Sequence, residues 1–331
     1  MKTIYFETIN LQLFAEPNTN VTTDSGLSAE NKTYYDMTLI DEASAELVHD
    51  QFAQKRDIPK NGGKKIEFRK FASIPKALTP LTEGVTPDGK KLSVETVEAT
   101  VSQYGDYITQ SDVLELTSID NTIVEATKIL GRQAGLTLDT ITREVLHTTD
   151  NEWFVPKADG TPVTDEGDLD DTCILTVDQV SQIAAYLKKC NAPKINGDYV
   201  AIIHPYVAYD LMADPNWRAP HSYQDTTELY NGEVGKIAGV RFVESSEAKV
   251  SANGVFYPLF MGANAYGTTE ITGGGLTTII KQKGSAGTAD PLDQRSSIGW
   301  KAMKTAEILV PAYLVRVFCK SRLSHKIKSA N

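Results

Sequence analysis

Five histidines are the first residues to test for chemistry, because imidazole is the commonest metal ligand and general base. They stand at His49, His147, His204, His221 and His325. No two of them show an H-x-H or H-x-x-x-H spacing, which would direct two imidazoles at one metal ion. The pattern therefore does not predict a zinc site. His204 stands directly before Pro205, which is typical of a turn or of the entry to a helix.

A second candidate is the glycine-rich stretch around Gly235 and Lys236, which contains two residues of a phosphate-binding loop. The spacing does not fit that motif. Tyr230 stands where its first glycine belongs, and Ile237 stands where Ser or Thr should follow the lysine. No G-x-S-x-G motif is present either, so a hydrolase of that type is not predicted. We interpret these glycines as bends between strands.

Two further residue types give no catalytic site. The five carboxylates between Asp165 and Asp171 could supply oxygen ligands to Ca²⁺, but the run lacks the EF-hand pattern, so a solvated loop is favoured. Cys173 and Cys190 could pair, but with Cys319 they are too few for a disulfide framework, and reduced, packed thiols are expected. The sequence therefore predicts neither an enzyme nor a cofactor.

The elements that would position any site come from a chain of 331 residues, 41% hydrophobic and 23% charged, enough for roughly two domains or one large fold. Lys and Arg number 33 against 43 acidic residues, for a net charge of −10. This argues against a basic grip on nucleic acid, although an acidic lining suits a container for DNA. The most apolar stretch, residues 306–318, contains Pro311 and Arg316, so a soluble protein without membrane spans is expected.

The first third of the chain has few residues suited to a core. Residues 1–33 are polar and turn-rich, which predicts an extended arm. Apolar spacing predicts an amphipathic helix over about 34–56, ended by Pro59. In residues 64–111, apolar and polar residues alternate on either side of the turn signal Asp88-Gly89, which predicts a long two-stranded ribbon. Because an isolated ribbon is only marginally stable in water, we expect it to lie on a neighbouring subunit.

Residues 119–147 carry the clearest helical signal in the chain. Their apolar residues recur every three or four positions and form one continuous stripe. Gly131 and Gly135 stand beside this stripe and suggest either a close approach by another backbone or simply tolerated glycines.

The second half of the chain mixes helices and strands without a regular alternation, which predicts the α+β class. A capping box of Thr176 and Gln179 starts one helix, and Pro205 starts a short one that ends near Met212. The predicted strands cover residues 198–203, 232–243, 255–267, 298–302 and 306–318.

An ordered series of segments resembles the major capsid proteins of tailed bacteriophages, in particular the podophage coat proteins of the N-four type. The series includes the long helix at 119–147. The other segments are Asn10-Leu-Gln-Leu-Phe-Ala-Glu16, Leu81-Thr-Glu-Gly-Val-Thr-Pro87, 204–217, 235–245 and Ser297-Ile-Gly-Trp-Lys301.

The resemblance implies the α+β fold of tailed-phage major capsid proteins. The implied parts are an N-terminal arm (1–33), an N-terminal helix (34–63), an extended β-hairpin loop (64–111), a peripheral domain with a spine helix (112–230, helix 119–147), an axial domain (231–297) and C-terminal strands that return to the peripheral domain, with a tail (298–331).

The resemblance also implies a structural protein that self-assembles into the icosahedral head shell around phage double-stranded DNA. The expected partners are copies of itself in hexamers and pentamers, a portal, a separate scaffold protein, and DNA held without sequence-specific contact. It is expected to reside in the virion and to assemble in the host cytoplasm. The alternatives are a bacterial nanocompartment shell of the same fold and a soluble enzyme of unknown type. The candidate subunit-contact residues are Leu81, Glu83, Val85, Lys90, Lys91, Leu11, Leu13 and Phe14.

Overall fold

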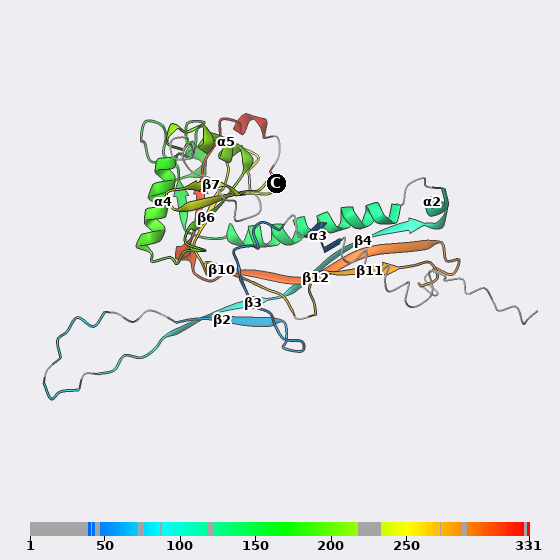
Figure 1. The fold of residues 1–331 in the computed structure, drawn as a ribbon, viewed down its shortest axis with the longest axis horizontal. Coiled ribbons are helices and arrows are strands. Elements are labelled where there is room, and N and C mark those ends of the chain that lie inside the picture. The colour runs from blue at the N-terminus through cyan, green and yellow to red at the C-terminus, as the bar shows by residue number, and fades with distance from the viewer. Residues whose placement is uncertain are drawn as a thin grey trace, which may run out of the picture.

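The longest helix lies along one face of a long sheet, and a lobe and a hairpin extend from the same end of this unit (Figure 1). This α+β arrangement is seen in a computed structural model. It describes residues 39–40, 42–43, 47–71, 74, 76–81, 83–86, 88–117, 122–217, 233–271, 273–285, 290–327 and 330–331. The predicted arm, with Leu11, Leu13 and Phe14, lies outside these residues.

The spine helix predicted at 119–147 is α3, Thr122–Leu146. Its apolar stripe is the core contact: Leu130 is 2% exposed and Ala134 is fully buried, and both pack in one cluster with Leu39 and Trp300. The close approach predicted at Gly131 is present, because a methyl group there would lie 2.8 Å from the carbonyl oxygen of Leu39. The helix can therefore approach the N-terminal segment this closely only at a residue that has no side chain.

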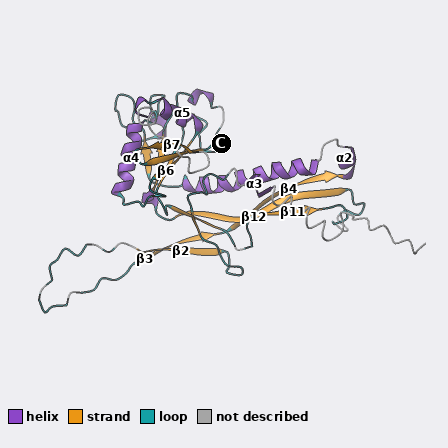
Figure 2. Ribbon diagram, in the orientation of Figure 1, coloured by secondary structure: helices purple, strands orange, loops and turns teal. Residues whose placement is uncertain are grey.

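The sheet under α3 is built around one long strand, β12, Arg295–Ile308 (Figure 2). β4 (Ser102–Ser111) and β11 (Thr277–Lys281) pair antiparallel with its first part, and β10 (Tyr266–Thr269) pairs with its last part. β1 (Gln54–Lys55) extends the sheet in parallel with β10. α2 (Asp112–Thr117) follows β4 at the far end.

The continuity of β12 corrects the prediction of two separate strands at 298–302 and 306–318. The strand runs through Lys304, which is 2% exposed and occupies an inward position of the alternation. A buried lysine breaks the apolar pattern in the sequence but not the strand, because its charge is paired inside the protein. The second predicted segment divides instead into a 3₁₀ turn, Pro311–Tyr313, and β13, Leu314–Phe318.

The predicted ribbon at 64–111 is only partly a hairpin. β2 (Lys65–Phe71) pairs antiparallel with β3 (Val94–Thr100), so the hairpin ends at residue 100. Residues 102–111 leave it and pair along β12. The physical reason is burial: Val101 is 6% exposed, and the side chains of Tyr104 and Ile108 pack against the cluster under α3.

The lobe is one six-stranded sheet with α4 (Val177–Lys189) and α5 (Pro205–Ala213) packed in its main core. The predicted helix starts at Thr176 and Pro205 are confirmed, but only half of the predicted capping box forms. The Thr176 hydroxyl accepts from the Gln179 amide at 3.5 Å, whereas the Gln179 side chain accepts from the Trp153 indole at 3.3 Å. His204 Nδ1 accepts from the Tyr206 amide at 3.1 Å. A one-turn 3₁₀ helix covers Glu166–Asp168 and another covers Ser324–Lys326. The strand order is β5 (Glu152–Phe154), β13, β9 (Leu259–Met261), β6 (Tyr199–Ile203), β8 (Val240–Glu244) and β7 (Glu233–Ile237).

This sheet corrects the predicted domain boundaries. β6 pairs with β8 and β9, so a boundary between 112–230 and 231–297 cuts through one sheet and one core. Residues 298–331 also divide between the two sheets, because β12 lies under α3 whereas β13 lies in the lobe. The chain passes repeatedly between the two units, which a division into consecutive segments does not capture.

The predicted N-terminal helix at 34–63 is also too long. Residues 39, 40, 42 and 43 are helical, but residues 49–53 form turns and are followed by β1. Ile58 forms a parallel bridge with Ile271. The helix stops before His49 because this residue and Asp50 turn inward to bury their polar side chains, which are 0% and 7% exposed as whole residues.

A buried polar network holds this turn against α3 and β12. The ring Nδ1 of His49 lies 2.6 Å from Asp139, whose carboxylate also accepts from the His49 amide at 2.7 Å. The Thr142 hydroxyl donates to Asp50 at 2.6 Å, and the Lys304 ammonium pairs with the same carboxylate.

Among the described helices, none is long and apolar enough to cross a membrane.

We expect Leu130→Asp to abolish assembly through loss of folding. An unpaired carboxylate at this 2%-exposed position costs about 4 kcal/mol or more, a large part of a domain's stability. The neighbouring substitution Ile129→Asp is the control, because Ile129 is 63% exposed. Urea unfolding of the unassembled subunits measures both, and equal stability of the two variants would contradict the assignment of the stripe as core.

Acid should destabilise the subunit through two histidines. Burial, with Lys249 and other nearby positive charges, holds the pKa of His147 well below its ordinary value, and burial lowers the pKa of His204 to about 4. Below about pH 6.5 the unfolded chain takes up protons that the folded chain refuses, so stability falls as the pH drops towards 4. His147→Gln should reduce this loss, by up to about 1.4 kcal/mol per pH unit, whereas His325→Gln, at an exposed position, should not. Urea unfolding at several pH values compares them, and an unchanged pH slope in the His147 variant would contradict this account.

Candidate assembly surfaces

The hairpin is fixed to the body at its base. One face of the paired strands carries Phe68 and Ala99, which are 4% and 0% exposed. The Phe68 ring fits against Gly267 of β10, where a methyl group would approach it to 2.9 Å. The Arg56 guanidinium lies over the same ring, 5.8 Å from its centre. The base is therefore part of the folded body, although the rest of the hairpin extends away from it (Figure 1).

The loop between β2 and β3 exposes apolar side chains along its described residues. Leu78 is 82% exposed, and the other large apolar residues between positions 74 and 92 are at least half exposed. These side chains contribute to no core of their own chain, and a run of exposed apolar residues on a projecting loop marks an interaction surface. The apolar residues concerned are Ile74 (52%), Leu78, Leu81 (76%), Val85 (62%) and Leu92 (60%).

The candidate residues of the sequence analysis lie on this loop as far as the structure describes them. Leu81 and Val85 are exposed apolar residues, and Glu83, Lys90 and Lys91 are exposed charged residues of the same loop. Their role in subunit contact stays a prediction. The sequence analysis missed Ile74, Leu78 and Leu92, although leucines scattered among prolines in a turn-rich stretch were the available signal.

A second group of exposed apolar residues lies at the opposite end of the long axis (Figure 1). It covers α2 and the start of α3, with Val113 at 62%, Leu116 at 81% and Ile129 at 63% exposed. Leu292, 75% exposed, is close in the fold, because the Asp112 amide donates to the Gln294 carbonyl at 2.9 Å. We call this group the distal patch. No motif in the sequence distinguished it, since its exposure depends on what the rest of the fold leaves uncovered.

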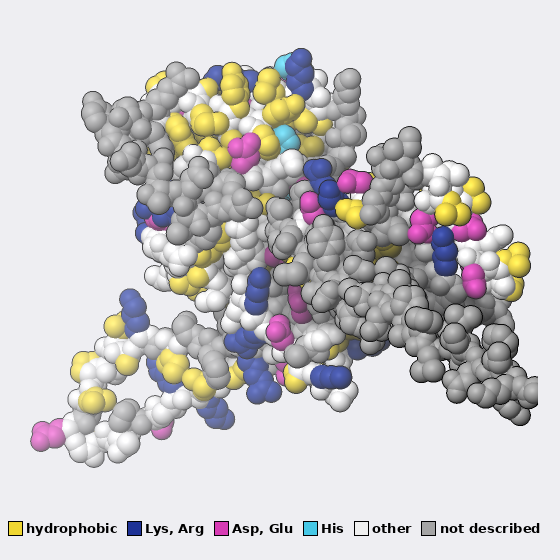
Figure 3. Space-filling model, turned by 45° about the vertical axis from the view of Figure 1, so that its right-hand side comes forward, with side chains coloured by type: hydrophobic (Ala, Val, Ile, Leu, Met, Phe, Trp, Pro, Cys, Tyr) yellow, Lys and Arg dark blue, Asp and Glu magenta, His cyan; other side chains and the backbone are white. Residues whose placement is uncertain are grey.

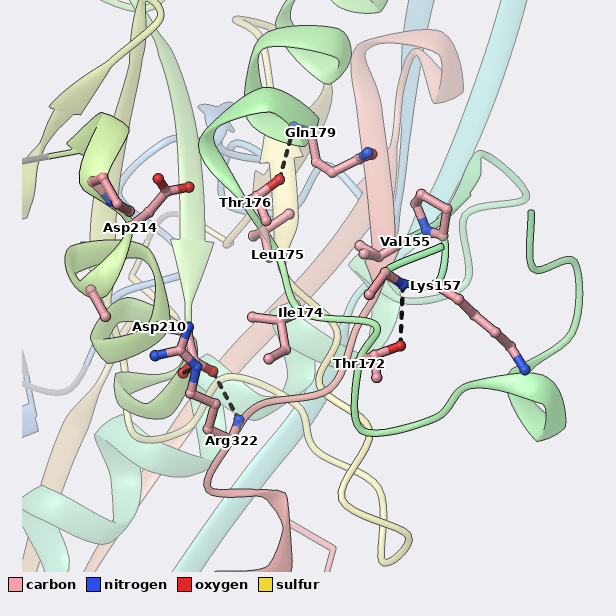
Figure 4. A pocket seen from close by; sticks show the side chains of 14 residues that line it. Val155, Lys157, Thr172, Ile174, Leu175, Thr176, Gln179, Asp210, Asp214 and Arg322 are labelled. Carbon is pink, nitrogen blue, oxygen red and sulfur yellow. Dashed lines mark hydrogen bonds and ion pairs between the residues drawn. The ribbon is translucent and has the colours of Figure 1, made fainter. Parts of the chain in front are cut away.

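The lobe contains a pocket of about 450 Å³ between the start of α4 and the end of α5 (Figure 4). The Asp210 carboxylate accepts from the Arg322 amide at 3.1 Å, and Asp214 accepts from the Val177 amide at 3.2 Å. None of the described residues that line this pocket is a His, Cys or Ser. Both carboxylates thus bind backbone amides of the lobe itself.

The acidic run and the cysteines also make local contacts. Hydrogen bonds from Thr172 lower the pKa of Asp170 to about 2. Burial raises the pKa of the Cys173 and Cys319 thiols, which disfavours the reactive thiolate. Among the residues that the structure describes, no group of three His, Cys, Asp or Glu side chains could hold a metal ion.

Comparison with known proteins assigns the molecule to a class. Residues 118–278, which span α3, the lobe helices and strands β5 to β10, match the family model of phage capsid proteins. Over this stretch the chain is similar to phage capsid proteins. No curated protein sequence matches it.

Solved capsid structures share the fold of this chain. The capsid of cyanophage P-SCSP1u is 15% identical, with a TM-score of 0.63 over 82% of this chain and 87% of that chain. The capsid of cyanophage Pam1 is 13% identical, with a TM-score of 0.64 over 85% and 92%. A virus-like particle from Pyrococcus furiosus is 10% identical, with a TM-score of 0.52 over 87% and 99%. The tailed-phage major capsid fold predicted from the sequence is thus confirmed.

The same findings bear on the functions considered above. The family match and the fold support a shell-forming capsid protein with a structural role. The nanocompartment alternative has no better support than the phage capsid, because the virus-like particle is less similar. Membership of the N-four type stays a prediction.

Limited proteolysis should reveal the loop. Trypsin should cleave unassembled subunits after Lys90 or Lys91 at least roughly tenfold faster than within α3, because exposed loop tips enter a protease site without unfolding. The double variant Lys90→Gln/Lys91→Gln should lose these first fragments, which mass spectrometry identifies. First cleavage after Lys128 or Arg132 of α3 would instead show that the helix opens before the loop.

Proposed function

We propose that this capsid protein builds the icosahedral head shell, as hexamers and pentamers, around packaged double-stranded DNA. The observation that carries the proposal is the pair of exposed apolar surfaces at opposite ends of an elongated subunit: the loop around Leu81 and Val85, and the distal patch around Leu116. A subunit with two such ends makes head-to-tail contacts, and these close into rings when the rotation between copies allows it.

The apolar loop gains most from such a contact. Burial of apolar surface stabilises a protein or complex by roughly 25 cal/mol per Å², and a loop with several exposed leucines lacks this stabilisation in the free subunit. In a shell the loop of one copy covers the body of its neighbour, so assembly supplies the missing burial. Leu81, Val85, Glu83, Lys90 and Lys91 are the residues of this proposed contact, with Leu11, Leu13 and Phe14 as contacts from the arm.

The other expected partners are the proteins that join shell assembly and the DNA that the shell encloses. We propose that a portal and a separate scaffold protein join assembly in the host cytoplasm, and that the protein has no enzymatic activity. The net charge of −10 supports contact with DNA that is neither tight nor sequence-specific, because acidic surfaces repel phosphates.

Substitution of the loop tests the proposal. Leu81→Ser/Val85→Ser should leave the subunit folded, because both side chains are exposed, but should raise the concentration needed for shell formation roughly tenfold or more. Sedimentation and electron microscopy measure shells, and circular dichroism verifies the fold. Tyr209→Ser, at a 53%-exposed position of α5, is the control and should assemble normally. Unchanged shell formation by the loop variant would remove the loop from the contact.

The absence of any particle in wild-type preparations, with or without a scaffold, would overturn the shell itself. Electron density inside particles from infected cells distinguishes packaged DNA from the protein cargo of a nanocompartment.

A further inference from the structure

Charge is unevenly distributed along this acidic chain. Residues 55–70 contain seven Lys and Arg against two acidic residues, for a net charge of +5. This segment comprises β1, the turn after it and β2, and so forms the base of the hairpin. We call it the basic base. In a protein with a net charge of −10, this is a marked local excess of positive charge.

The cations of the basic base whose side chains are described lie at the surface. Lys55, Arg56, Lys60 and Lys64 are all exposed, and Figure 3 shows Lys and Arg side chains gathered near the hairpin. The strands themselves balance part of the charge through the pairs Lys65–Glu98 and Arg69–Glu67, at 3.2 and 3.6 Å. In the part of the chain that is described, Lys60 and Lys64 form no ion pair, so their charge is available to a partner.

The complement of this surface lies in the lobe. Residues 157–178 contain seven acidic residues against one lysine, for a net charge of −6. Among the described residues, two of these acids form ion pairs, Lys157–Asp170 at 3.5 Å and Lys320–Asp171 at 3.4 Å, and the Asp171 side chain is still 86% exposed. Asp168 is exposed beside them. We call residues 157–178 the acidic loop.

The two charged surfaces do not neutralise each other within one subunit. Among the described residues, the ion pairs of the basic base stay within the hairpin, and those of the acidic loop stay within the lobe. Opposite charges on separate parts of one molecule are satisfied when a second copy brings them together, and a contact between unlike surfaces is of the head-to-tail kind.

We propose that the basic base of one subunit binds the acidic loop of a neighbouring copy, so that charge pairing orients the hairpin during assembly. The inference rests on the proposed self-assembly. A protein partner is favoured over nucleic acid because the basic base continues directly into the apolar loop of Leu78 and Leu81, which a phosphate backbone would leave uncovered. Charge pairs between surfaces mainly set encounter rate and register, and salt screens them.

Charge reversal provides the test. Lys60→Glu/Lys64→Glu should raise the subunit concentration needed for assembly roughly tenfold at about 50 mM salt and much less at about 500 mM. Asp168→Lys/Asp171→Lys should have the same effect, and the four substitutions combined should restore assembly. The matched control is Lys188→Glu/Lys189→Glu, which reverses two exposed lysines at the end of α4 and should leave assembly unchanged.

The outcomes separate this inference from the proposed function. Normal assembly of the Lys60/Lys64 variant, or failure of the combined variant to recover, overturns the charge pairing while the shell stands. If the Lys60/Lys64 variant loses affinity for a short DNA duplex while its assembly is unchanged, the basic base binds nucleic acid. That outcome overturns the charge pairing between subunits as well. If the wild-type protein fails to assemble at every salt concentration, the proposed function is overturned, and this inference with it.

Discussion

The fold depends on a buried charge pair between Asp50 and Lys304, where the N-terminal segment crosses the spine helix and the long strand. The Lys304 ammonium also donates to the Leu138 carbonyl at 3.2 Å, and Thr142 satisfies the other carboxylate oxygen of Asp50. A buried pair of this kind adds little net stability, but removal of one partner leaves an uncompensated charge at a cost of roughly 3–5 kcal/mol. It therefore acts mainly as a constraint that fixes which surfaces meet.

That constraint reaches the functional surfaces through the backbone. With Asp50 fixed, β1 has only a few residues in which to reach β10, and the Phe68 ring then fits on Gly267 at the base of the hairpin. The direction in which the loop projects is thus decided by packing close to the crossing point. A shell protein requires this, because an apolar loop that points differently in each copy cannot close a regular lattice.

The molecule divides its residues between two tasks. The lobe and the cluster under α3 bury apolar side chains in the ordinary way, with strand β6 buried at every position. The loop, by contrast, exposes Leu78 and Leu81 almost completely. This is unfavourable for an isolated subunit, and it is consistent with a protein whose final burial is completed by copies of itself.

The sequence by itself determined the elements whose signals are local. The stripe around Leu130 fixed α3, and Thr176 fixed the start of α4, because helical periodicity and caps involve residues a few positions apart. The candidate loop could also be located, since turn residues interrupt its apolar positions. Only the tertiary structure decided what depends on distant partners. Contacts between segments far apart in the chain decide the pairing of residues 102–111 with β12 and the continuation of that strand through Lys304. They also decide the interleaving of the two sheets and the exposure of Leu116.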